Sequence, residues 1–145
     1  MKIKFDIQNT YTEPEIHLCN REKTPELVRI REILQNFLGT GLRVHKGQEA
    51  RTLVPAQIIR IYSASKKVYI RTAEDCYEVR ERLYTLEEQL ADWGFVRISN
   101  SEIVNMEQIE KLDMSHVGTI RMYMKNGDET YVSRRYVKKI KEELM

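Results

Sequence analysis

The sequence predicts an α+β fold, with a small N-terminal α+β extension at residues 1–48 and a strand-rich domain at residues 49–145. Three observations support this expectation. From Arg51 on, short segments of alternating apolar and polar residues follow one another closely, as in antiparallel strands. Apolar residues at helical spacing are confined to three separate stretches. Each of these stretches carries a helix start or stop signal, so the helices are expected to be few and bounded.

Composition sets wide limits on function. Of the 145 residues, 41% are apolar and 32% charged, and the net charge is only +2, so attraction to nucleic acid would have to be local. The first residues alternate in polarity and do not resemble a signal peptide, and no apolar run approaches 18 residues. Cys19 and Cys76 stand alone, so we expect no disulfide framework, metal site or cofactor, and a reducing cytoplasm fits.

The N-terminal part is expected to contain short strands around one helix. Residues 2–7 alternate like a half-buried strand, and Glu15–Cys19 is expected to form a second one. Thr24-Pro25 marks a helix start, and Gly39 ends the helix. Its apolar stripe is Leu27, Ile30, Leu34, Phe37 and Leu38, and a further strand is expected at Leu42–His45. This unit offers no phosphate-binding loop or paired catalytic acids, which favours a packing or dimerisation role.

The strand-rich part begins with a hairpin and a helix. Residues 58–62 and 67–72 read as two strands whose connecting tip carries Ser65, Lys66 and Lys67. A third strand is expected at residues 76–79. Leu83, Leu86 and Leu90 then form the inner stripe of a helix that ends at Gly94.

Asn126-Gly127 predicts a second hairpin. Ile120, Met122 and Met124 would face the core. We expect a three-residue loop that pairs Lys125 with Glu129 and Tyr123 with Tyr131.

Two stretches are candidates for binding. Between apolar ends, residues 97–102 gather short polar side chains, including Arg97, Ser99, Asn100 and Ser101. They form either an ordinary turn or a set of groups that reach base edges and phosphates. The second stretch is the helix that starts at Ser133 with Arg134 and Arg135 in its first turn, against the helix dipole. Such a start suits a docked phosphate, whereas the alternative is a solvated basic face.

These two stretches carry a family resemblance. Residues 95–105 (FVRISNSEIVN), followed by Lys125–Asp128 and then residues 132–140 (VSRRYVKKI), resemble the LytTR DNA-binding domain over about residues 50–145. The resemblance implies a mostly-β fold of small antiparallel sheets with two peripheral helices. It also implies that loops, and not a recognition helix, enter successive major grooves of double-stranded DNA at a direct-repeat site.

The resemblance also implies which residues touch DNA. Carried over by position, they are the Ser65–Lys67 tip, the Ser99–Ser101 turn with Asn100 foremost, and Arg134 with Arg135 foremost. Two positions depart from the family pattern: Ser99 stands where His is frequent, and Glu102 where an aromatic residue is usual. The chain is similar to stand-alone LytTR regulators, which implies a small membrane-protein antagonist. A homodimer is expected because repeated half-sites need two copies.

A division of labour among the candidate residues follows. Lys66, Lys67, Arg134 and Lys138 would neutralise phosphates, whereas Asn100 and Arg135 would read base edges.

Other classes of protein are less compatible with the sequence. The chain has fewer than 50 residues before the strand-rich part, too few for a receiver domain of about 120 residues. An RNA-binding module, with tyrosines stacking on bases, and a protein-interaction domain remain as alternatives. Ser115, His116 and Asp113 are only sequence neighbours, so no enzyme and no small-molecule substrate are expected.

Overall fold

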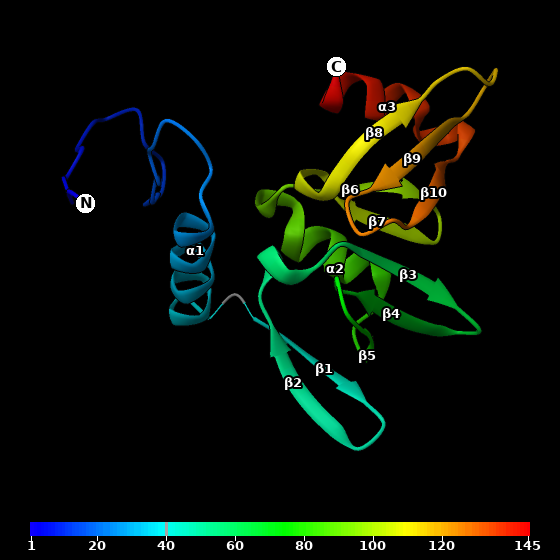
Figure 1. Cartoon of the computed structure of the whole chain (residues 1–145), viewed down its shortest axis with the longest axis horizontal. Coiled ribbons are helices and arrows are strands. Elements are labelled where there is room, and N and C mark those ends of the chain that lie inside the picture. Colours follow the sequence, from blue (N-terminus) through cyan, green and yellow to red (C-terminus); the bar gives the residue numbers. More distant parts are fainter. Residues whose placement is uncertain (40) are drawn as a thin grey trace.

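Two antiparallel sheets make up most of the molecule (Figure 1). The structure is a computed structural model that describes residues 1–39 and 41–145. One sheet has seven strands in the order β2-β1-β5-β4-β3-β7-β6, and the other has three in the order β10-β9-β8. The expected α+β, mostly-β fold is confirmed.

The elements follow one another in this order: α1 (Pro25–Phe37), β1 (Leu42–Lys46), β2 (Glu49–Leu53), η1 (Pro55–Gln57), β3 (Arg60–Ala64), β4 (Lys67–Arg71), β5 (Cys76–Val79), α2 (Leu83–Leu90), η2 (Ala91–Trp93), β6 (Phe95–Ser99), β7 (Glu102–Asn105), η3 (Met106–Gln108), β8 (Ile109–Asp113), β9 (Ile120–Met124), β10 (Glu129–Val132) and α3 (Arg134–Leu144). The elements labelled η are short 3-10 helices.

Two apolar cores share strands β6 and β7 as a common wall. One core fills the space between the seven-stranded sheet and α2, and the other joins the three-stranded sheet to α3. Along β6, Phe95 enters the first core and Val96 the second. Along β7, Ile103 and Val104 divide in the same way. Because both faces of this hairpin are covered, it is a firmly packed base for the turn at its tip.

The predicted helices α2 and α3 are present and packed as expected. Leu83, Leu86 and Leu90 of α2 are buried, and Gly94 ends the segment in a left-handed conformation with φ of 84°. In α3, Ile140 is fully buried, and Val137 and Leu144 pack against the same core.

The N-terminal extension differs from the prediction. The expected strands at residues 2–7 and 15–19 are wrong, because both stretches are irregular. Their alternating pattern finds no sheet edge to join, and Ile3 and Phe5 are more than 90% exposed. Helix α1 is present with its predicted cap, since Thr24 Oγ1 accepts a hydrogen bond from Leu27 N at 3.3 Å.

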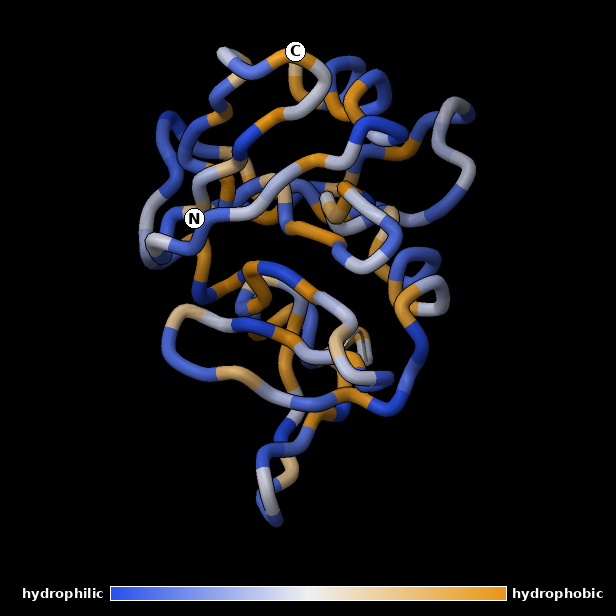
Figure 2. Tube along the Cα trace, turned by 90° about the vertical axis from the view of Figure 1, so that its right-hand side faces the viewer, coloured by the Kyte–Doolittle hydropathy of each residue, from blue (hydrophilic) through white to orange (hydrophobic). Residues whose placement is uncertain are grey.

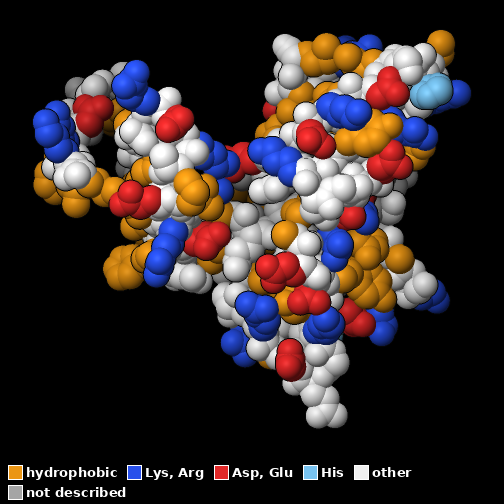
Figure 3. All heavy atoms as spheres, viewed as in Figure 1, with side chains coloured by type: hydrophobic (Ala, Val, Ile, Leu, Met, Phe, Trp, Pro, Cys, Tyr) orange, Lys and Arg blue, Asp and Glu red, His pale blue; other side chains and the backbone are white. Residues whose placement is uncertain are grey.

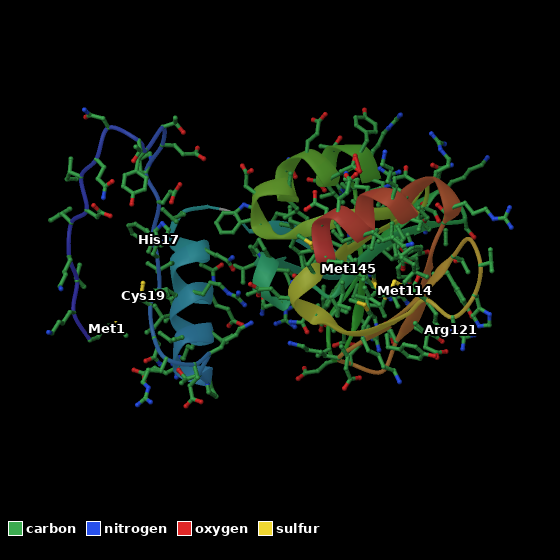
Figure 4. The ribbon with its side chains drawn as sticks, turned by 90° about the horizontal axis from the view of Figure 1, so that it is seen from above. Met1, His17, Cys19, Met114, Arg121 and Met145 are labelled. Atoms are coloured by element: carbon green, nitrogen blue, oxygen red, sulfur yellow. The ribbon has the colours of Figure 1, made fainter. Side chains whose placement is uncertain are left out.

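Helix α1 is joined to the β-rich body mainly by polar contacts. Gln35 accepts a hydrogen bond from Ala56 N at 3.3 Å, and Arg31 pairs with Glu107 at 2.5 Å. Within the described residues, neither core contains a residue before Leu42. Phe37 and Leu38 of the predicted apolar stripe are exposed, whereas Leu27, Ile30 and Leu34 are half-buried. The extension projects to one side of the body in Figures 3 and 4.

Strand β1 links the extension to the body. It pairs with β2 and with β5, so the boundary predicted between residues 48 and 49 falls in the turn of the β1–β2 hairpin.

The predicted register of the β9–β10 hairpin is wrong by two residues. Tyr123 lies opposite Glu129, and Arg121 lies opposite Tyr131. Lys125 leaves the ladder because its N–H donates to Gln108 O at 2.8 Å. An even shift keeps the faces unchanged, so Met122 and Met124 are buried as predicted.

A candidate nucleic-acid interface

Three polar segments that are far apart in the sequence lie on one edge of the molecule. They are the β3–β4 turn, the β6–β7 turn and the first turn of α3, all at the right of Figure 1. In Figure 2 this side faces the viewer, and the outer turns are hydrophilic whereas the inner strands are largely hydrophobic. Backbone hydrogen bonds tie the three segments together: Ser63 N donates to Ser101 O at 2.8 Å, and Ser133 N donates to Ile98 O at 2.9 Å. We call this surface the polar edge.

The β3–β4 turn is short and rigid. Ala64 pairs with Lys67, and the two residues between them, Ser65 and Lys66, have φ values of 50° and 65°. Two successive left-handed residues give the primed turn that matches the twist of a hairpin. Ser65, Lys66 and Lys67 are all exposed, as a DNA-contacting tip requires. Lys67 Nζ also lies 3.4 Å from a carboxylate oxygen of Glu78.

The β6–β7 turn presents Asn100 at its tip. Most of the polar stretch predicted at residues 97–102 lies in strands. Ser99 pairs with Glu102 next to a bulge, so that only Asn100 and Ser101 form the turn. Ser99 Oγ accepts a hydrogen bond from Ser101 N at 3.2 Å, which stabilises the turn and keeps the two serines close together. The Asn100 side chain is exposed.

The first turn of α3 meets the β6–β7 turn directly. Asn100 Oδ1 lies 3.3 Å from the Tyr136 hydroxyl and 3.5 Å from Arg135 Nη1, and both of these groups are donors. Asn100 and Arg135, the two side chains predicted to read bases, are therefore neighbours. Tyr136 was not predicted as part of the site. The sequence could not identify it, because its role depends on the contact between Ser133 and Ile98.

Ser133 occupies the predicted N-cap position without capping the helix by its side chain. Its hydroxyl lies 3.5 Å from Ile98 O instead. The first N–H groups of α3 therefore do not donate to this hydroxyl. Together with exposed Arg134 and Arg135, they give the helix start a positive character that suits an anion.

Arg97 is engaged within the protein. Its Nε donates to Ser99 O at 2.7 Å, its Nη2 to Asn100 O at 2.6 Å, and its Nη1 pairs with Glu87 at 3.3 Å. The side chain is only 14% exposed. Arg97 holds the shape of the β6–β7 turn from behind, and its predicted contact with DNA stays a prediction.

Positive charge continues along α3 beyond the polar edge. Arg134, Lys138 and Lys141 line one side of a groove of about 590 Å³ that runs between α3 and Gly118 of the β8–β9 loop. Arg134 and Lys138 lie one helical turn apart, so both can face the same strand of a docked polyanion.

This geometry is that of a binding module whose polar tips project from a rigid β body, and the comparison with known families agrees. Residues 49–145 match the LytTr DNA-binding domain, and the chain belongs to this family.

Among proteins of known sequence, the chain is similar to uncharacterized HTH-type transcriptional regulators of Staphylococcus aureus. It is 43% identical to the one from strain NCTC 8325 over 97 residues, which is 67% of this chain and 65% of that protein. It is 46% identical to the one from the bovine strain RF122 over 89 residues, which is 61% of this chain and 60% of that protein. The matched part thus spans less than two thirds of the length of these relatives.

A solved structure shows the same fold. It is the LytTr DNA-binding domain of a Bacillus cereus protein described as a methyl-accepting/DNA response regulator, with a TM-score of 0.69 and 21% identity. The match covers 72% of this chain and 95% of that domain. In this chain, five strands separate α2 from α3, so the matched region is organised around strands and turns.

Proposed function

We propose that this protein is a transcriptional regulator that binds duplex DNA sequence-specifically and reads the major groove with turns. The observation that carries the proposal is the polar edge, on which three separated segments are hydrogen-bonded into one surface. The names of the Staphylococcus aureus relatives agree with a regulatory role. A reading surface of this kind contacts DNA through two turn tips and one helix start, and no helix lies along the groove.

The residues of the polar edge divide into two groups by chemistry. Lys66, Lys67, Arg134 and Lys138 are exposed cations that neutralise phosphates and fix the register of the protein on DNA. Asn100 and Arg135 read base edges, because an amide suits adenine and a guanidinium suits guanine O6 and N7. The short hydroxyls of Ser65, Ser99 and Ser101 accept or donate to either group.

Two experiments in succession test the proposal: selection of bound sequences from a random duplex library, and then binding of a variant to the selected duplex. The full chain should enrich a defined sequence and prefer it to single-stranded RNA in competition. Arg135→Ala should then lose about 1–3 kcal/mol on the selected site and little on random duplex. Its side chain is exposed, so the fold should be unaffected. Failure to enrich any sequence, or an unchanged ratio between selected and random duplexes in the variant, would reject the proposal.

The extension before β1 is the proposed dimerisation unit. Ile33, Phe37 and Leu38 are 57%, 85% and 54% exposed on or next to α1, and a second copy of the chain could cover them. Repeated half-sites in DNA would need such a pair. Phe37→Glu should shift the full chain from dimer to monomer in sedimentation without changing its thermal unfolding. If the wild-type chain is monomeric at tens of micromolar concentration, this part of the proposal is wrong.

The place of action and the regulation of the protein are also proposals. No helix in the described part of the chain combines the length and apolar character needed to cross a bilayer. A bacterial DNA-binding protein would act in the cytoplasm. The resemblance to stand-alone LytTR regulators supports a small membrane protein as antagonist, which co-purification from membranes with tagged full chain would test.

A further inference from the structure

A buried carboxylate lies directly behind the β6–β7 turn. Glu102 follows Ser101 and begins β7, and its side chain is only 8% exposed. Carboxylates are seldom buried to this extent unless they are paired. Both oxygens of Glu102 are engaged: Oε1 accepts from Arg60 Nη1 at 2.6 Å, and Oε2 accepts from the hydroxyl of Thr130.

Arg60 extends this contact to the β9–β10 turn. Its Nε donates to Asp128 Oδ2 at 2.9 Å, and Arg71 Nε lies 3.4 Å from the same oxygen. Although burial acts in the opposite direction, the hydrogen bond from Arg60 holds the pKa of Asp128 below its usual value. The carboxyl group therefore stays ionised, and Arg60 bridges two carboxylates.

The cluster connects the two sheets behind the polar edge. Arg60, Arg71 and Glu102 belong to the seven-stranded sheet, whereas Asp128 and Thr130 belong to the β9–β10 hairpin. Glu102 is the next residue after Ser101, and β10 leads from Thr130 directly into Ser133 and α3. The cluster thus links the backbone that carries Asn100 to the backbone that carries Arg135.

Stability alone does not require a charge at this place. Apolar side chains of similar volume usually replace a buried ion pair at little or no cost in stability, whereas charged hydrogen-bonded groups impose a defined geometry. Base reading depends on such geometry, because hydrogen bonds weaken steeply when donors and acceptors are displaced or misaligned.

We propose that Glu102 is a positioning residue for sequence discrimination: through Arg60 and Thr130, its carboxylate sets where Asn100 lies relative to Arg135. This inference rests on the proposed DNA-reading function. Glu102 itself does not reach DNA, and it acts through the turn that precedes it and the strand that leads into α3.

The main test replaces the charged pair by apolar side chains in the full chain. In the double variant Arg60→Met/Glu102→Leu, Asp128 loses Arg60 but keeps Arg71 as its partner, so the variant should unfold within a few degrees of the wild type. Its affinity for random duplex, and the salt dependence of that affinity, should be unchanged. The ratio of its affinities for the selected and random duplexes should fall tenfold or more. An unchanged ratio in the folded double variant overturns the proposal.

Two milder variants keep the test decisive if the double variant does not fold. Glu102→Gln retains the shape of the side chain, and its amide can still accept from Arg60 while its NH2 donates to the Thr130 hydroxyl, so most of the ratio should be preserved. Thr130→Val removes only the hydroxyl that Glu102 accepts from, and should lower the ratio a few-fold. A lower ratio in Thr130→Val than in Glu102→Gln supports positioning by hydrogen bonds, whereas no change in either overturns it.

An exposed control ion pair and a second readout separate this inference from the proposed function. Lys46→Met/Asp75→Leu removes another ion pair, 2.5 Å long and remote from the polar edge, and should leave the ratio unchanged. Hydrogen exchange should become faster in peptides covering residues 97–105 and 126–136 of Arg60→Met/Glu102→Leu, but not of the control. If the wild type reads no sequence, the proposed function fails. This inference then fails with it. If the wild type does read a sequence, but Arg60→Met/Glu102→Leu keeps the ratio and its hydrogen exchange is unchanged, only the positioning role is overturned.

Discussion

The charges of the polar edge predict how strongly salt weakens DNA binding. Lys66, Lys67, Arg134 and Lys138 are the cations assigned to phosphates. Each neutralised phosphate contributes about −0.9 to the slope of log affinity against log salt concentration, so one bound chain should give a slope of about −3.6. Between 50 and 200 mM salt, which is about 0.6 decades, the affinity should therefore fall roughly 150-fold.

Lys138→Ala is the variant best suited to this measurement. Lys138 is exposed in the middle of α3, where alanine is a good helix former, so the fold should not change. Its slope should be about −2.7, with a loss of only about 40-fold over the same salt range.

Fluorescence anisotropy with a random-sequence duplex measures the slope directly. Lys125→Ala is the control, because the β9–β10 turn next to it lies at the far side of the hairpin from the polar edge (Figure 1). Its slope should equal that of the wild type. An equal change of slope in both variants, or none in Lys138→Ala, would refute the assignment of phosphate contacts.

Three further predictions follow from packing and charge. Ile140→Ala should destabilise the domain by about 2–5 kcal/mol in urea unfolding because Ile140 is fully buried, whereas the exposed neighbour Lys139→Ala should stay within about 0.5 kcal/mol. Arg97→Lys should cost about 1.5–3 kcal/mol in the same assay, since an ammonium cannot span both turn carbonyls as the guanidinium does; an unchanged midpoint would contradict the bracing role. Because the pKa of Asp128 is lowered in the folded chain, its contribution to stability is complete above the ordinary value of 3.8 and is lost as pH falls through the lowered pKa. Asp128→Asn should therefore flatten the fall in unfolding free energy between about pH 5 and pH 2, and an unaltered pH profile would disprove this linkage.

Local signals in the sequence predicted local structure well. Thr24-Pro25 marks the start of α1, and Gly94 closes the segment after α2, because capping and left-handed φ depend on neighbouring residues only. The alternation in residues 2–7 led to a wrong prediction of a strand. Alternation shows only that one face of a segment is apolar, whereas a strand also needs a neighbouring strand to pair with. The Asn126-Gly127 turn was found, but the register of its hairpin was not, because Lys125 N–H donates to Gln108 O outside the hairpin.

The candidate site was predictable by residue type and not by arrangement. Asn100 and Arg135 stand out as base-reading chemistry, and the structure places them side by side. The bracing of the turn by Arg97 and the burial of Glu102 have no sequence signature. Both depend on β6 and β7 lying between two cores, which is a property of the whole chain.

The left-handed pair Ser65–Lys66 has a consequence for the thermodynamics of complex formation. The proposed contacting segments are this two-residue turn, the short β6–β7 turn and a helix start. None of them is a long loop that would have to become ordered when DNA binds. Association should then resemble rigid docking, in which the heat-capacity change reflects only the surface removed from water. Calorimetry at several temperatures would reveal a larger negative value if a disordered segment folded on binding.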